Sequence, residues 1–169
     1  MPAHYRAWVE ILQPYGIDFP EKLFYSMGGM PTGKIVEKLF SSRSELPDVP
    51  TLTRQKEEAF LEKLGEIRPI EKVVEVARRN RGIAPMAVAS GGYRHMVELT
   101  LRQIGILDWF PVLVAAEDTT RHKPEPDVFL EAARRLGVTP AECTVYEDTD
   151  LGIEAARRAG MAWVDVRKM

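Results

Sequence analysis

The sequence predicts an α/β protein in which a parallel sheet is preceded by a small helical unit. Three observations predict this fold. Residues 1–67 carry apolar residues at helical spacing and no convincing strand, whereas after Pro69 short apolar runs alternate with amphipathic helices. A length of 169 residues suits one core with a small insertion. Apolar residues make up 45% of the chain and charged residues 28%, which excludes a disordered or low-complexity protein.

The first part of the chain is predicted to be helical throughout. Near its start, apolar residues recur at the i, i+3, i+4, i+7 spacing of an amphipathic helix: Trp8, Ile11, Leu12 and Tyr15. The composition of residues 28–33 (Gly-Gly-Met-Pro-Thr-Gly) predicts a loop. The charged run 54–66 then places three apolar residues on one helical face: Ala59, Phe60 and Leu64.

Residues 68–169 predict the alternating strands and helices of a Rossmann-like parallel sheet. The predicted strands are four short apolar runs at residues 86–89, 112–115, 144–146 and 163–166. Amphipathic helices lie around them, and Gly137 is a C-cap signal for the third helix. This alternation indicates βαβ units and a sheet covered on both faces. Because ligands bind at the carboxyl ends of such strands, the residues that follow each strand are the candidates for a functional site.

Ser90 follows the first predicted strand, and Gly91 and Gly92 come next. A hydroxyl group with open backbone N–H groups at the start of a helix forms an anion-binding site, for which phosphate is the usual ligand. The alternative is that Ser90 only caps the helix and the glycines only form the turn.

Lys123 lies beyond the second strand, in a segment that Pro124 and Pro126 stiffen. Asp127 is placed to cap the helix that follows. Lys123 is therefore held near the strand ends, where its ammonium group could neutralise a phosphate or a carboxylate. The alternative is a solvated loop lysine.

Three carboxylates, those of Glu147, Asp148 and Asp150, follow the third strand ahead of a helix. Mg²⁺ prefers oxygen ligands and takes only one or two protein carboxylates. The alternative is that these acidic residues merely complement the helix dipole. Together, the hydroxyl, the lysine and the acidic residues predict a Mg²⁺-assisted phosphoryl-transfer site at one edge of the sheet.

These segments resemble three motifs of the haloacid dehalogenase superfamily. They are Val88-Ala89-Ser90-Gly91, Lys123-Pro124-Glu125-Pro126-Asp127, and the run 147–156 followed by Ala159-Gly160-Met161. The similarity points to the β-phosphoglucomutase-like branch, and within it to small sugar-phosphate phosphatases of the fructose-1-phosphatase type. It runs over essentially the whole chain, and the pair Lys-Pro-x-Pro-Asp and Glu-Asp-x-x-x-Gly is highly specific.

The resemblance implies a Mg²⁺-dependent enzyme that hydrolyses a small sugar phosphate through an aspartyl-phosphate. It implies that Ser90 and Lys123 are catalytic residues that bind the transferring phosphoryl group, with Gly91 at the substrate. It also implies that Asp148 ligates Mg²⁺ and that Glu147 holds a metal-bound water. Residues 1–67 are then a helical cap, and residues 68–169 are the core.

His4 and Lys56 match positions of the cap that contact substrate in this branch. For His4, the alternative is a solvated histidine near a terminus. For Lys56, the alternative is a lysine on a charged helical face.

The sequence departs from the family at the first motif, Asp-x-Asp-Gly-Thr, which is absent. In the family, the first Asp is the nucleophile and the second acts as acid and base. Both stand at the tip of the first, central strand, so we expect this chain to lack that strand and to be inactive as written. Either Met1 is an internal methionine of an active enzyme, which we favour, or the chain is a non-catalytic remnant that binds a sugar phosphate or a protein.

Two other functions compete with a phosphatase. A β-phosphoglucomutase-like phosphomutase grips a second phosphate with a cap arginine, but Thr32 occupies that place and cannot make a bidentate contact. Residues 28–34 fit the G-x-x-x-x-G-K pattern of a P-loop nucleotide binder. Against it, Ile35 stands where a Ser or Thr should reach Mg²⁺, and Pro31 removes a cradling N–H group.

Charge and cysteine content limit the partners that we expect. With 23 basic and 25 acidic residues the net charge is −2, which gives no electrostatic reason to expect nucleic acid or an anionic membrane. The single cysteine, Cys143, excludes an internal disulfide and favours a reducing, cytoplasmic compartment. No stretch has the roughly 18 apolar residues of a membrane span. We expect a monomer that binds a small molecule.

Overall fold

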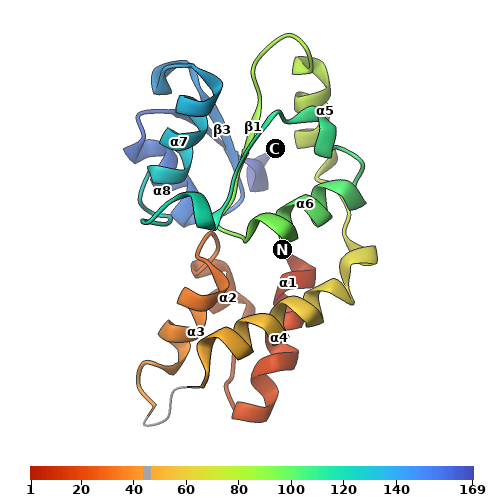
Figure 1. The fold of residues 1–169 in the computed structure, drawn as a ribbon, viewed down its shortest axis with the longest axis vertical. Helices are drawn as coiled ribbons and strands as arrows, with labels where there is room; N and C mark the ends of the chain where they lie inside the picture. The colour runs from red at the N-terminus through yellow and green to blue at the C-terminus, as the bar shows by residue number, and fades with distance from the viewer. Residues whose placement is uncertain (44–46) are drawn as a thin grey trace.

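The computed structural model describes residues 1–43 and 47–169, which Figure 1 shows as a helical part below an α/β part. The helical part contains, with η for a short 3-10 helix, α1 (Pro2–Leu12), η1 (Gln13–Tyr15), α2 (Glu21–Ser26), α3 (Thr32–Phe40), α4 (Val49–Leu61) and η2 (Leu64–Glu66). The α/β part contains α5 (Glu71–Asn80), β1 (Ala87–Ala89), α6 (Arg94–Gln103), η3 (Leu107–Trp109), β2 (Val112–Val114), η4 (Ala116–Asp118), α7 (Asp127–Leu136), η5 (Pro140–Glu142), β3 (Thr144–Glu147), α8 (Asp150–Arg158), β4 (Ala162–Asp165) and η6 (Val166–Lys168). None of the helices described in these two ranges is long and apolar enough to cross a membrane.

The helical part packs around α4, against which α1 and α3 both lie. The apolar stripe of α1 points into this core, where Trp8 and Leu12 are almost completely buried. The stripe ends one turn earlier than the sequence spacing predicts, because α1 stops at Leu12 and Tyr15 lies in η1, 37% exposed. Pro14 has no N–H group to continue the helical hydrogen bonds, so the chain tightens into η1 there.

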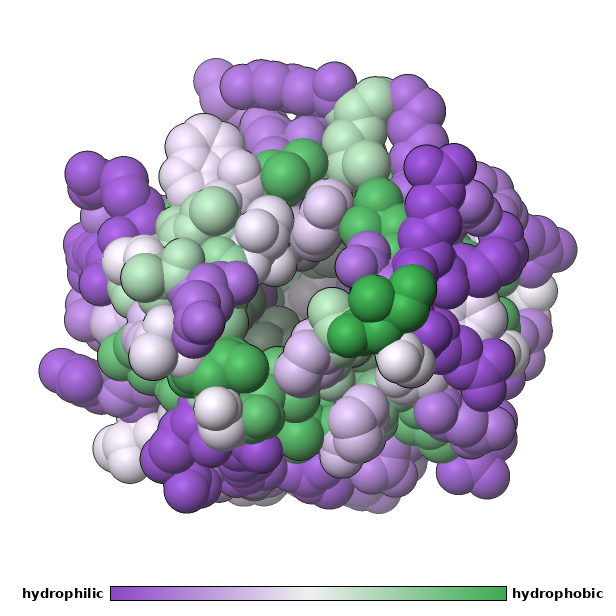
Figure 2. Space-filling model, turned by 90° about the horizontal axis from the view of Figure 1, so that it is seen from above, coloured by the Kyte–Doolittle hydropathy of each residue, from purple (hydrophilic) through white to green (hydrophobic). Residues whose placement is uncertain are grey.

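All four predicted strands are present, and they form two parallel pairs. In the first pair Ala87 of β1 lies opposite Val112 of β2, and in the second Thr144 of β3 lies opposite Ala162 of β4. Among the residues that the structure describes, the pairs are separate two-stranded sheets, with no ladder between β1 and β3. Figure 2 shows the molecule from the side of the α/β part, with a hollow in the middle and apolar side chains at its rim. The parallel sheet is therefore interrupted between its halves.

Helices cover both faces of the β1–β2 pair. Successive residues of a strand point to opposite faces. Accordingly, Val114 packs in one apolar cluster with α7 and α8, while its neighbour Leu113 packs in another with α5 and α6. This arrangement is the one that alternating strands and helices predict.

The two ends of α7 test the predicted cap residues. Gly137 follows the helix with a φ of 71°, in the left-handed region, which confirms the C-cap. The capping role predicted for Asp127 is wrong: the N-cap is Pro126, and Asp127 is the first helical residue. Its carboxylate instead pairs with the Arg121 guanidinium at 3.0 Å.

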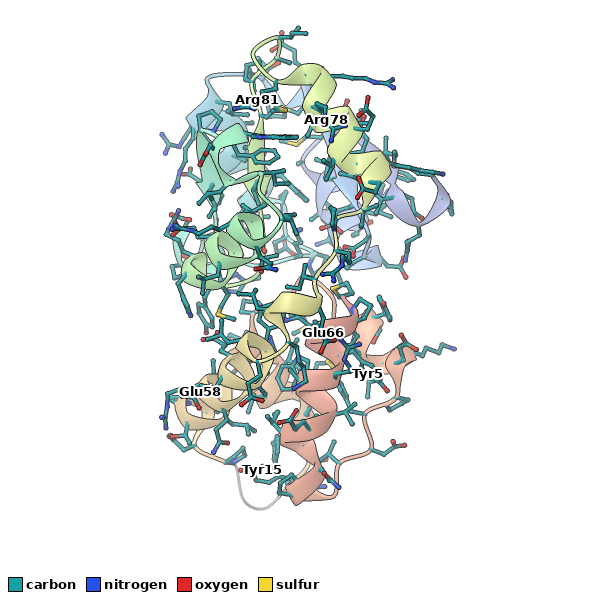
Figure 3. All side chains as sticks on the ribbon, turned by 90° about the vertical axis from the view of Figure 1, so that its right-hand side faces the viewer. Tyr5, Tyr15, Glu58, Glu66, Arg78 and Arg81 are labelled. Atoms are coloured by element: carbon teal, nitrogen blue, oxygen red, sulfur yellow. The ribbon has the colours of Figure 1, made fainter. Side chains whose placement is uncertain are left out.

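Side chains on the face drawn in Figure 3 tie neighbouring elements together. At the end of α5, the guanidinium carbons of Arg78 and Arg81 lie 6.0 and 5.3 Å from the centroid of the Trp109 ring of η3. Near the junction of the two parts, Glu66 of η2 pairs with Arg6 of α1. These contacts link α5 to η3 and η2 to α1.

Candidate active site

Lys123 joins the carboxyl ends of two strands that belong to different sheets. Its ammonium group donates a hydrogen bond to the Ala89 carbonyl oxygen at the end of β1 (3.4 Å) and forms an ion pair with Glu147 at the end of β3. Both side chains are buried, with Lys123 6% and Glu147 7% exposed. The centroid of the Phe129 ring lies 4.7 Å from the Lys123 nitrogen. Lys123 is thus a buried cation between the strand ends and not a solvated loop lysine.

Ser90 lies directly beyond the end of β1. Its hydroxyl oxygen accepts a hydrogen bond from the Gly92 backbone N–H group at 3.0 Å. The next helix, α6, begins only at Arg94, with Tyr93 as its N-cap. Ser90 therefore does not cap this helix, and its hydroxyl closes the turn that precedes it.

Both carboxylate oxygens of Glu147 have hydrogen-bond donors as partners. One carboxylate oxygen pairs with Lys123, and the other accepts hydrogen bonds from the backbone N–H groups of Asp148 (2.8 Å) and Thr149 (2.9 Å) and from the Thr149 hydroxyl (3.0 Å). Burial by itself raises the pKa of Glu147, but the charge of Lys123 and these hydrogen bonds outweigh burial and lower that pKa. Glu147 is therefore a fixed carboxylate.

Asp148 is adjacent to Glu147 but differs from it in its partners. Burial and the neighbouring charge of Glu147 raise the pKa of Asp148. The amino group of Met1 partly opposes this rise, and burial lowers the pKa of that amino group. No side-chain donor among the described residues binds the Asp148 carboxylate, so its oxygens are available to a cation.

The acidic pair fits a Mg²⁺ ion, which takes one or two protein carboxylates and fills its other positions with water or phosphate oxygens. A divalent cation beside a buried carboxylate with a raised pKa stabilises the charged form of that carboxylate. No group of three or more His, Cys, Asp or Glu side chains that could hold a metal ion occurs in residues 1–43 and 47–169. A metal here would therefore depend on Asp148, on Glu147 and on oxygens from outside these side chains.

Buried Lys56 and half-buried His4 form a second group, inside the helical part. The Lys56 nitrogen lies 2.8 Å from Nδ1 of His4, whose ring stacks on Phe60 with 3.8 Å between centroids. Burial lowers the pKa of Lys56 to about 8 and, with the charge of Lys56, holds the pKa of His4 well below its usual range. His4 is therefore neutral and accepts the hydrogen bond from Lys56. Lys56 is therefore buried rather than part of a solvated helical face, whereas His4 is half-buried, and no hydrogen bond of the described residues links the pair to Lys123.

The segment that fits the P-loop pattern has another structure. Its lysine, Lys34, lies on α3, is exposed and pairs with Glu37 at 2.8 Å. The short helix α2 precedes the segment, where a P-loop requires a strand. Residues 28–34 therefore fit the P-loop pattern in sequence but do not form a P-loop.

Two glycines of that segment do lie at the candidate site, although no pattern in the sequence predicts it. Gly29 packs on the side-chain stem of Lys123, and Gly28 packs against the methyl group of Thr149. Residues 28–31 form a loop as predicted, but α3 begins at Thr32 and includes Gly33, so the predicted loop is two residues too long. A loop signal also does not show what the loop touches. In the sequence, the sign of a close contact is the pair of adjacent glycines, which have no side chains to keep another segment away.

Comparisons with known proteins identify the family to which this chain belongs. Residues 1–160 match the family of haloacid dehalogenase-like hydrolases. Over 98% of this chain and 88% of the relative, the sequence is 38% identical to the fructose-1-phosphate phosphatase YqaB of Escherichia coli (strain K12). It is 27% identical to the β-phosphoglucomutase of Bacillus subtilis (strain 168), over 96% of this chain and 75% of that protein. The crystal structure of a β-phosphoglucomutase from Clostridium difficile shares the fold, with a TM-score of 0.82 at 24% identity over 96% of this chain and 76% of that one. The chain therefore belongs to the haloacid dehalogenase-like hydrolases and has a sugar-phosphate phosphatase among its relatives.

Proposed function

We propose that the strand ends bind the phosphoryl group of a small sugar phosphate monoester, which is hydrolysed with the help of Mg²⁺. The observation that carries this proposal is the buried Lys123, held between the ends of β1 and β3. Ser90 and Gly91 place a hydroxyl and a turn at the same edge. A phosphoryl group there would meet the ammonium group of Lys123 and the turn after β1, as an oxyanion requires.

Asp148 is the direct ligand that we propose for Mg²⁺, and Glu147 would hold a water bound to the metal. When bound, Mg²⁺ supplies positive charge next to the phosphoryl oxygens. Glu147 would also orient Lys123 through the ion pair between them. Hydrogen bonds from Thr149 in turn fix Glu147.

The helical part, residues 1–67, is proposed to cover the sugar while the core, residues 68–169, binds the phosphoryl group. His4 and Lys56 are the proposed substrate contacts of this cap. A buried ammonium group beside a neutral imidazole supplies several hydrogen-bond donors without a competing carboxylate, which suits sugar hydroxyl or phosphate oxygens. Because a relative is a fructose-1-phosphate phosphatase, fructose 1-phosphate is the first substrate to test.

We further propose that hydrolysis needs a nucleophilic aspartate that the 169 residues do not place at the site. The printed sequence contains no Asp-x-Asp-Gly-Thr segment. The interruption of the sheet supports this proposal, because the pairs β1–β2 and β3–β4 are not joined by a ladder among the described residues and a central strand would join such pairs. By itself, the chain then binds a sugar phosphate without turning it over. Thr32 begins α3 where a mutase needs an arginine, which favours a phosphatase over a phosphomutase.

Release of phosphate from fructose 1-phosphate in the presence of Mg²⁺ tests the proposal. We expect no release by the 169-residue chain, and release after a strand that ends in Asp-x-Asp-Gly-Thr is fused ahead of Met1. Turnover by the unfused chain would contradict the proposal about the nucleophile. A fused chain that folds but neither binds nor hydrolyses any of a panel of sugar phosphates would contradict the proposed function.

A further inference from the structure

The turn between β3 and α8 carries Asp148, and both of its ends are connected to the end of β4. In the β3–β4 ladder, Glu147 lies opposite Asp165, so the start of the turn is fixed to the end of β4. The turn ends at Asp150, the first residue of α8. Arg167 of η6 binds both Asp165 and Asp150. Ladder and arginine together therefore close a ring that contains the turn.

The contact of Arg167 with Asp165 is the strong half of this bridge. The Nε and Nη2 atoms of Arg167 donate to the two carboxylate oxygens of Asp165 at 2.7 and 2.9 Å, the paired geometry that makes arginine–carboxylate contacts strong and directional. The backbone N–H group of Arg167 also donates to Asp165, at 3.1 Å. Because the Asp165 side chain is only 5% exposed, little water competes for it. Asp165 therefore holds the guanidinium group in one orientation.

The contact of Arg167 with Asp150 would be worth little by itself. The Asp150 side chain is 82% exposed, and an isolated ion pair at the surface loses most of its gain to the entropy of the two side chains. Here Asp165 already orders the arginine, so the bond from Nη2 to Asp150 at 2.8 Å costs less of that entropy. The helix dipole would explain why an acidic residue begins α8, but it requires no contact with Arg167. The bridge therefore ties the start of α8 to the end of β4.

Asp148 depends on this bridge more than Glu147 does. The oxygens of Glu147 are bound by Lys123 and Thr149, whereas no side-chain donor among the described residues binds the Asp148 carboxylate. The place of the Asp148 carboxylate is therefore set by the backbone of the turn. Groups that orient a metal ligand affect the affinity of the site for the metal, so whatever fixes this backbone should affect the binding of a cation.

We propose that Arg167 is a positioning residue for Asp148, and that its bridge from Asp165 to Asp150 sets the affinity of the site for a divalent cation. This inference rests on the proposed function, in which Asp148 is the direct ligand of Mg²⁺. Charge alone makes the opposite prediction: a guanidinium group near a cation site repels the cation, so its removal would strengthen Mg²⁺ binding. The sign of the effect therefore separates positioning from electrostatics.

Calorimetric titration of Mg²⁺ into Arg167→Met and Arg167→Lys tests the proposal, with Arg158→Met as the matched control. The lysine variant keeps the charge and can pair with Asp165, but it lacks the planar fork that binds two carboxylates at once. Arg158 matches Arg167 because the two side chains are 41% and 42% exposed. Arg158 also bridges two acidic residues, Glu125 and Glu154, and it lies at the opposite end of α8 from the turn.

We expect both Arg167 variants to bind Mg²⁺ about five- to tenfold more weakly than the wild type, near the low end of what groups that support a metal ligand contribute. Arg158→Met should bind Mg²⁺ as the wild type does. Lys168 still pairs with Asp165 in these variants, so we expect them to fold, which circular dichroism checks. Hydrogen exchange, followed by NMR, should become faster at the amides of Asp148 and Thr149, which donate to Glu147 across the turn.

Unchanged or tighter Mg²⁺ binding by Arg167→Met, or wild-type affinity in Arg167→Lys, would overturn the positioning role. Equal weakening by Arg158→Met would overturn it as well. If Arg167→Met does not fold, Arg167→Lys decides between the same outcomes. Unchanged exchange at the two amides would show that Arg167 does not hold the turn. If the wild type binds no Mg²⁺, the proposed function of Asp148 fails and Arg167 has no ligand to position, while the exchange rates still decide whether the bridge holds the turn.

Discussion

At the scale of single residues, Lys56 is a charge that the fold buries without a paired carboxylate. Lys56 is 4% exposed, and the nearest polar partner of its ammonium group is the neutral His4. The aromatic rings of Trp8 and Phe60 lie 5.8 and 5.4 Å from it and offset only part of the lost hydration. A residue that costs stability in this way is a candidate for function.

Lys56→Met should therefore stabilise the protein and weaken sugar-phosphate binding. The folded-state pKa of Lys56, about 8, lies below its ordinary value of 10.5, so the cost of the buried charge is fully present below pH 8 and disappears as the pH rises to 10.5. The gain at pH 7 is at most about 3 kcal/mol and should shrink across that pH range. Urea unfolding at several pH values measures it, with the exposed Lys38→Met as control. A variant that is less stable at pH 7 would show that the hydrogen bond to His4 outweighs the buried charge.

Lys123 and Glu147 differ from Lys56, because each of these two buried charges has a partner of opposite charge. Glu147→Gln leaves Lys123 buried without a carboxylate and should lower the free energy of unfolding by about 3 kcal/mol at pH 7. Glu154→Gln, which breaks exposed pairs with Arg157 and Arg158, should cost less than about 1 kcal/mol. Denaturant titration of both variants measures the difference, and equal losses would contradict a buried, specific pair.

The pH dependence of this pair follows from its lowered carboxyl pKa. A carboxylate whose folded pKa is depressed contributes stability above its unfolded pKa, which is the ordinary value of 4.5. That contribution is lost as the pH falls through the lower folded pKa. The difference between wild type and Glu147→Gln should therefore be constant near neutral pH and shrink in acid.

At the scale of elements, the N-cap residue of α8 also binds the carboxylate at the end of β3. Thr149 is the N-cap of α8 and accepts from the Gly152 N–H group, while its hydroxyl donates to Glu147. Thr149→Ala should lower the free energy of unfolding by about 1 to 2 kcal/mol, because the cap is lost. Thr149→Ser keeps the hydroxyl and should recover most of that loss in thermal unfolding. Equal destabilisation by Ala and Ser would show that the methyl group, and not the cap, matters.

Local sequence patterns predicted the elements well, because the signals are local. The four apolar runs, the left-handed Gly137 and the alternation of helix and strand each follow from a few neighbouring residues. Where local signals competed, the prediction was wrong: Pro14 ends the stripe of α1 before Tyr15, and Pro126 takes the cap position expected for Asp127. Helix ends are decided by one or two residues, so a single proline is enough to shift them.

The contacts that make the candidate site could not be predicted in the same way. The order of strands places Ser90, Lys123 and Glu147 at one edge, and this much follows from βαβ topology. The ion pair across the interrupted sheet and the approach of Gly28 to Thr149 depend on how segments far apart in sequence pack. Neither leaves a periodicity or spacing that a single sequence displays.

At the scale of the whole molecule, the proposed phosphate site lies where the helical part meets the α/β part. Lys123 ties the two sheets together at this site, and Gly29 of the helical part packs on its side-chain stem. The central claim is that this lysine binds the phosphoryl group.

The most direct test of that claim is a calorimetric titration of inorganic phosphate into the protein with Mg²⁺ present. We predict measurable binding to the wild type, several-fold weaker binding to Ser90→Ala, and no detectable binding to Lys123→Met, with circular dichroism confirming that each variant is folded. Chelation of Mg²⁺ should weaken binding to the wild type. Equal affinity of the wild type and folded Lys123→Met, or no binding to the wild type, would contradict the account.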